Sequence, residues 1–147
     1  MDGARAFPLQ KGGCAVKRRW SFIAGGLLAA GVLLFALRGW RPYKDLNAAD
    51  IVSATVHLTP PDETVEIKDR GELAGCLRQL VVWQKSDAFR AYSGQSVTFT
   101  LAMADGSRQE VMVCAPLVVI NGTGYKAKYE PCEALSRYAN GALENIQ

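Results

Sequence analysis

An uncharged, almost wholly apolar run of 17 residues near the N-terminus constrains this chain more than any other feature. It extends from Ser21 to Leu37 and reads SFIAGGLLAAGVLLFAL. As a helix rising about 1.5 Å per residue, the run and the tryptophans beside it cover roughly the 30 Å hydrocarbon thickness of a bilayer. Trp20 and Trp40 stand where the two interfaces would lie. The run therefore predicts a single membrane-spanning helix over residues 21–37.

Two other interpretations of the run fit its sequence less well. A helix buried in a core would carry a polar stripe with a period of 3.6 residues, and this run is apolar on every side. A cleaved signal peptide would have a shorter apolar region and a small-x-small cleavage site, which the following residues, LRGWRPYKDL, do not offer. Retention as a signal anchor is expected, and cleavage is the open alternative.

Charge predicts the orientation of the anchor and the place of the folded part. Five basic residues in the segment 1–20 precede the helix and three follow it closely, which favours a cytoplasmic tail and an extracytoplasmic C-terminal domain in the cell membrane. Residues 38–49 lack periodicity and predict a juxtamembrane linker, so the domain is expected over residues 50–147. From Asp45 onward 13 acidic residues outnumber 9 basic ones, and this argues against nucleic acid as a partner.

Alternation of apolar and polar residues predicts most of the sheet in this domain. The period of two is clearest in IVSATVHL, from Ile51, and in SVTFTLAM, from Ser96. Asp105-Gly106 supplies a hairpin turn after the second of these strands. Further strands are expected at residues 64–67, 109–114, 117–120 and 125–129.

Two amphipathic helices accompany these strands. Asp69 and Glu72 suit a helix N-cap and its partner three residues on, and apolar residues then follow at spacings of three and four. Pro131 suits the first residue of a second helix, because its missing N–H would have no partner there. About six strands, mainly antiparallel, with two helices on one face predict an α+β fold, an open two-layer sandwich.

Three stretches of the domain, in their order along the chain, carry a resemblance: VHLTPPDETVEI, YSGQSVTFTLAMADG and VVINGTGYKAKYEPCEAL. They resemble a small extracytoplasmic domain of Gram-positive bacteria, which occurs on lipoproteins, on short single-pass proteins and behind membrane metallopeptidases of the β-lactam-sensor type. The resemblance covers about residues 50–143 and implies the location and the α+β fold, but no activity. His57 is the only histidine, so the H-E-x-x-H zinc site of those peptidases is excluded.

Cysteines give one candidate for chemistry. Cys14 precedes the apolar run and is expected on the reducing cytoplasmic side, whereas Cys76, a small buried hydrophobe by its spacing, is expected outside. A disulfide between Cys114 and Cys132 would tie the last helix to the sheet. If Cys132 is free instead, the helix N-terminus would act to lower its pKa, and Glu130 and Glu133 would oppose that shift.

The densest group of aromatic and charged side chains predicts a recognition surface. It consists of Tyr125, Lys126, Lys128 and Tyr129, and Tyr92 joins it if the preceding loop folds toward it. Tyrosine is favoured where one protein contacts another. Tyrosines packed under the last helix beside solvated lysines would explain the same residues without a binding role.

No catalytic motif is evident in the sequence. A G-x-S-x-G nucleophile, a phosphate-binding glycine loop and a calcium loop are all absent, so no enzyme activity, no metal and no cofactor are expected. We expect a non-enzymatic binding, sensor or accessory module whose partners are the bilayer, through residues 21–37, and another membrane protein. The alternative is a cell-surface hydrolase or thiol enzyme with scattered site residues. Small residues at Gly25 and Ala29 leave pairing of the membrane helix open as a third role.

Overall fold

The computed structural model describes residue 3 and residues 13–147, apart from the side chains of residues 13–20 and 36. The rest of the predicted cytoplasmic tail lies outside the described residues. The chain divides into two compact units, Met1–Arg38 and Gly39–Gln147, and each is described by itself.

The first unit contains the helix α1 (Gly13–Arg38), which includes the whole apolar run. Its large apolar side chains are exposed, and the exposed fractions of Phe22, Leu28 and Phe35 are 70%, 71% and 80%. Among the residues that the structure describes, no helix is found with the length and apolar character needed to cross a membrane. The anchor over residues 21–37 stays a prediction.

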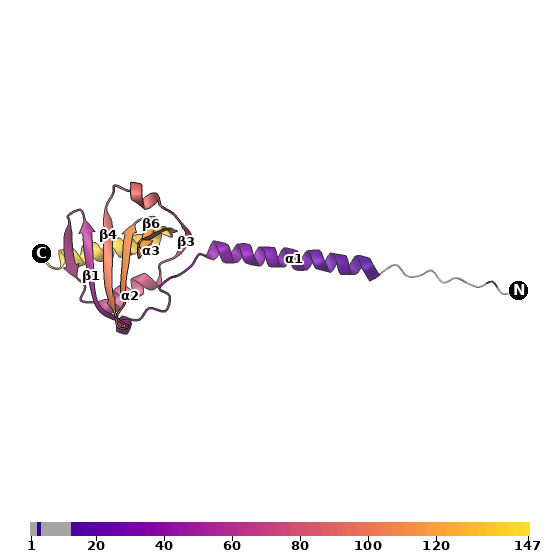
Figure 1. Ribbon diagram of the computed structural model, residues 1–147, viewed down its shortest axis with the longest axis horizontal. Helices are drawn as coiled ribbons and strands as arrows, with labels where there is room; N and C mark the ends of the chain where they lie inside the picture. Colours follow the sequence, from indigo (N-terminus) through magenta and orange to yellow (C-terminus); the bar gives the residue numbers. More distant parts are fainter. Residues whose placement is uncertain (1–2, 4–12) are drawn as a thin grey trace. The chain divides into compact units, whose positions relative to one another are not determined.

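The second unit is built on a seven-stranded antiparallel sheet (Figure 1). Across the sheet the order of the strands is β2 (Glu63–Glu66), β1 (Ile51–Thr59), β4 (Ser96–Met103), β5 (Arg108–Cys114), β6 (Leu117–Ile120), β7 (Thr123–Ala127) and β3 (Val82–Lys85). Chain neighbours pair directly from β1 to β2 and from β4 through to β7. The predicted α+β class and the antiparallel pairing are confirmed, and the sheet has one strand more than predicted.

One face of the sheet forms the core because the strand registers place apolar residues opposite one another. Two rows cross β1, β4 and β5, and every member is at most 1% exposed: Val56–Phe99–Val111 and Leu58–Val97–Val113. The intervening residues, among them Thr98 and Thr100, lie on the opposite face and remain partly accessible. The alternation read from the sequence is therefore the alternation between the two faces.

Two helices, α2 (Arg70–Arg78) and α3 (Tyr129–Glu144), cover the apolar face, as predicted (Figure 1). The side chain of Asp69 accepts a hydrogen bond from the backbone N–H of Glu72 at 2.9 Å, which is the predicted N-cap of α2. The third residue of α3, not the first, is Pro131. A proline there costs no hydrogen bond within the helix, because the first four N–H groups of a helix have no intrahelical partner. Two single-turn helices, η1 (Ala48–Asp50) and η2 (Ala88–Ala91), complete the fold.

The strand β3 was not predicted. Of its four residues only Val82 is buried, so it shows no alternation to read. It forms because Val82 pairs with Ala127 and Lys85 with Tyr125, more than 35 residues away along the chain. Such pairing is set by tertiary structure rather than by local sequence.

The segment expected as a linker packs on the domain instead. Trp40 and Val82 exchange two backbone hydrogen bonds of 2.7 and 2.8 Å. Tyr43 and Leu46 are each only 8% exposed and belong to the core. The compact unit thus begins at Gly39, eleven residues before the predicted boundary. No sequence pattern indicated this, because Tyr43 and Leu46 are buried singly and form no periodic apolar pattern.

Candidate functional site

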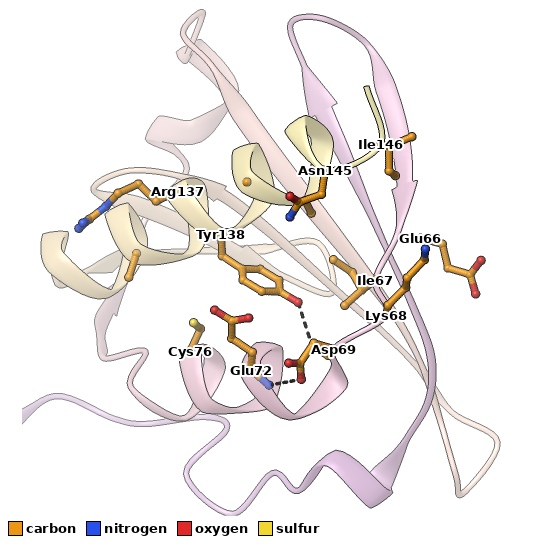
Figure 2. Close-up of a pocket in the computed structure, with 13 residues that line it drawn as sticks. Glu66, Ile67, Lys68, Asp69, Glu72, Cys76, Arg137, Tyr138, Asn145 and Ile146 are labelled. Atoms are coloured by element: carbon orange, nitrogen blue, oxygen red, sulfur yellow. Dashed lines mark hydrogen bonds between the residues drawn. The ribbon is translucent and has the colours of Figure 1, made fainter.

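A cavity of about 550 Å³ lies between the two helices, beside the segment that joins β2 to α2 (Figure 2). Its volume is in the range of small-molecule sites, which span roughly 300–1,000 Å³. The apolar part of the lining comes mainly from α3 and the segment after β2: Ile67, Ala134, Ala142 and Ile146. The polar and charged part of the lining consists of Glu66, Lys68, Asp69, Glu72, Cys76, Arg137, Tyr138 and Asn145.

Tyr138 joins the two helices at the inner end of this cavity. Its hydroxyl donates a hydrogen bond of 3.0 Å to the backbone carbonyl of Asp69, and the Asp69 carboxylate in turn caps α2 (Figure 2). Its ring stacks on Phe99 of the core, with 6.4 Å between the ring centroids. The position of the ring is therefore fixed from the sheet and from the neighbouring helix.

Burial and nearby carboxylates act on two weakly acidic groups of the cavity. Burial, followed by the carboxylates of Glu72 and Asp69, raises the pKa of Tyr138 to about 12. Burial, followed by Glu72, also raises the pKa of the Cys76 thiol. Burial disfavours an ionised form of either group, and the smaller effect of the carboxylates disfavours a further negative charge beside them.

Glu72 is the acidic group best placed to meet a ligand. Figure 2 shows its carboxylate directed toward Tyr138 and Cys76, and no described residue forms an ion pair with it. The basic residue Arg137 points away from Tyr138 in the same view and lies 3.9 Å from Glu133. The arrangement can hold an apolar body against the helices and a cationic group between Glu72 and Tyr138.

The predicted recognition surface only partly comes together. Tyr125, Lys126, Lys128 and Tyr129 follow one another from β7 into α3, and Tyr125 is half-buried with its ring 6.1 Å from that of Trp40. Tyr92 is placed differently, because its hydroxyl donates to the backbone carbonyl of Gln95. No described hydrogen bond or ring contact joins Tyr92 to the other four, and none of the five lines the large cavity. Their binding role stays a prediction.

The two cysteines of the predicted disulfide are free thiols in the structure. Cys114 ends β5 and Cys132 lies in the first turn of α3, and both are buried. Burial, with a smaller effect of Cys114, raises the pKa of Cys132 to about 12. The pKa of Cys132 is therefore raised and not lowered, because burial disfavours the charged thiolate.

One polar arrangement was missed in the sequence. His57 Nδ1 lies 2.8 Å from Thr64 Oγ1, and His57 Nε2 lies 2.9 Å from Asp62 Oδ1. The order of hydroxyl, imidazole and carboxylate is that of a catalytic triad. The three side chains lie at the turn from β1 to β2 and are accessible to solvent. None of them lines the large cavity or a smaller cavity that includes Lys128. We assign it to stabilising the turn; the spacing H-x4-D-x-T was its signal.

The large cavity was also missed, because its lining is contributed by three segments. The available signal was a group of small residues on α3 that leaves space facing α2, including Ala134, Gly141 and Ala142. Within the described part of the chain, no group of three or more side chains that could hold a metal ion is found.

Comparison of the chain with models of protein families, with curated proteins and with solved structures gave no match. The resemblance to the Gram-positive extracytoplasmic domain therefore stays a prediction.

Proposed function

We propose that this chain is a membrane-anchored binding protein whose domain takes a small molecule with an apolar body and a positively charged amine. The observation that carries the proposal is the unpaired carboxylate of Glu72 beside the ring of Tyr138, inside a cavity of about 550 Å³. An ammonium group placed there would gain a charge-assisted hydrogen bond and contact with an aromatic ring. A carboxylate ligand would meet repulsion from Glu72 and Asp69.

Binding is favoured over thiol chemistry by the state of the cysteine in the cavity. Burial, followed by Glu72, raises the pKa of Cys76 and so disfavours the thiolate, which is the reactive form. Burial likewise raises the pKa values of Cys114 and Cys132. These directions support a binding module and oppose the thiol enzyme.

The anchor is supported by the sequence of α1 and by its exposed side chains. Seventeen consecutive residues, with Ala36 counted, carry no charge, and the described large apolar side chains among them are exposed to solvent. Such a surface needs an apolar environment. The proposal retains the cell membrane as location, with the N-terminus cytoplasmic and the domain outside.

Three matched probes test the proposed ligand class: 2-phenylethylamine, 2-phenylethanol and phenylacetate share one ring and differ in charge. We expect the amine to bind the full-length chain in detergent micelles most tightly, the alcohol about tenfold more weakly, and phenylacetate not measurably, since a hydrogen bond to a charged group contributes about 1.5–3 kcal/mol. Isothermal titration calorimetry measures all three. Equal binding of the amine and phenylacetate would contradict the proposal.

Two variants and one control variant locate the binding site. Glu72→Gln should reduce amine affinity about tenfold, whereas Glu110→Gln on β5, distant from the cavity lining, should leave it unchanged. Gly141→Phe should abolish binding by filling the cavity, because a Cβ at Gly141 has no atom within 4 Å. Unchanged binding in Gly141→Phe would place the ligand elsewhere.

A further inference from the structure

An exposed aromatic and basic surface lies along β3, at the edge of the sheet. We call it the β3-edge surface and define it by Trp40, Trp83, Arg41, Lys85 and Lys128. The two tryptophans are 55% and 47% exposed, which is unusual for the largest apolar side chains. The three basic residues are also exposed.

Backbone contacts hold these five residues on one edge. Trp40 is hydrogen-bonded to Val82 of β3, and the backbone N–H of Lys128 donates to the carbonyl of Val81 at 2.9 Å. Arg41 lies beside Lys128 at a small cavity of about 340 Å³. The surface is thus a fixed part of the fold rather than a property of a free loop.

The charge of this surface is opposite to that of the domain as a whole. From Gly39 onward the chain has 13 acidic and 11 basic residues. At the β3-edge surface three basic residues gather, and the acidic side chain that shares the small cavity with Arg41 and Lys128 is Glu130. Exposed tryptophans beside Lys and Arg are typical of surfaces that sit among lipid headgroups.

The position of the surface along the chain indicates which membrane it would contact. Only Gly39 separates Arg38, the last residue of α1, from Trp40. Gly39 is itself confined: its φ is +70°, and a Cβ there would lie 2.6 Å from the side chain of Val81. Along the chain, a single residue therefore separates α1 from the first residue of the β3-edge surface.

We propose that the β3-edge surface seats the domain on the anionic phospholipid headgroups of the membrane that holds α1. This inference rests on the proposed anchor. The tryptophans would lie at the interface, and Lys85 and Lys128 would contact lipid phosphates. Arg41, whose Nε and Nη2 donate to the Arg78 carbonyl, would add positive charge beside them. The cavity between α2 and α3 would then have a fixed orientation relative to the membrane.

Quenching of Trp83 fluorescence by brominated lipid tests the seat. The full-length chain with Trp20→Phe and Trp40→Phe, which leave Trp83 as its one tryptophan, is reconstituted into vesicles of phosphatidylcholine with or without phosphatidylglycerol. With brominated phosphatidylcholine as the quencher in both vesicle types, we expect strong quenching where phosphatidylglycerol is present and at least threefold less where it is absent. Adding Lys85→Glu and Lys128→Glu should remove most of the quenching, since each basic residue near an anionic surface contributes roughly a fivefold gain in binding.

Controls distinguish a β3-edge surface that does not contact the headgroups from a helix that does not anchor the chain. Lys68→Glu with Arg108→Glu, a matched double reversal away from β3, should keep the quenching. Flotation of the vesicles on a density gradient reports the anchor independently. A chain that floats while Trp83 stays unquenched overturns the seat and retains the anchor, and a chain that does not float overturns both. Equal quenching in the two vesicle types would also overturn the seat, because the lipid charge would then have no role.

Discussion

At the scale of single residues, a buried hydroxyl without a partner makes a sharp prediction. Among the described side chains, Tyr43 Oη is buried and has no hydrogen-bond partner, whereas the hydroxyl of Tyr138 is bonded to Asp69. We expect Tyr43→Phe to leave the free energy of unfolding unchanged or raise it by about 1 kcal/mol, and Tyr138→Phe to lower it by about 1 kcal/mol. Urea denaturation of the full chain in detergent measures both. A large loss in Tyr43→Phe would show that its hydroxyl has a partner.

The stability of the unmodified chain and that of Tyr43→Phe should depend differently on pH. Burial, with a smaller effect of Tyr125, raises the pKa of Tyr43 to about 12 in the folded chain, from an ordinary value of 10.0. Between these values the unfolded chain has lost a proton that the folded chain retains, so stability falls as the pH rises from 10 toward 12. Between pH 10 and 12 the free energy of unfolding of Tyr43→Phe should fall less steeply than that of the unmodified chain. Below about pH 9 the difference between the two proteins should stay constant.

At the scale of secondary-structure elements, two glycines distinguish a close approach of backbones from open space. A Cβ at Gly124 in β7 would overlap the Ser86 carbonyl oxygen and the Phe89 ring, and the Ser86 N–H donates to the Gly124 carbonyl at 2.9 Å. A Cβ at Gly141 in α3 would meet nothing within 4 Å.

We therefore expect opposite effects of one substitution at the two sites. Gly124→Ala should lower the free energy of unfolding by about 1–3 kcal/mol, because the backbone of β3 and η2 must shift. Gly141→Ala should raise it by about 0.5–1 kcal/mol, because alanine favours a helix interior over glycine. Thermal unfolding followed by circular dichroism gives both values. A neutral Gly124→Ala would mean that the segment after β3 is not held against β7.

At the scale of the whole molecule, the anchor makes the largest prediction. In cells, the full chain should stay in the membrane pellet after alkaline carbonate extraction. Leu28→Arg with Val32→Arg should release it, since each arginine at the centre of a membrane helix costs roughly 2.5–3.5 kcal/mol of insertion. Leu28→Ala with Val32→Ala is the matched control and should stay in the pellet. Release of the unmodified chain would rule the anchor out.

Local patterns determined the parts of this fold that depend on local physics. The alternation in β1 and β4 predicted which residues face the core, and Asp69 predicted the start of α2, because side-chain direction and capping are settled within a few residues. The apolar run, too, predicted a helix there, and α1 contains it.

Tertiary structure alone decided what depends on distant segments meeting. β3 exists because Val82 pairs with Ala127 and Trp40, and burial in the folded domain sets the raised pKa of Cys132. The cavity at Glu72 arises where α2, α3 and the end of β2 leave space unfilled. A gap in packing is not encoded at any one position, so the small residues of α3 indicate a cavity only once the helix that faces them is known.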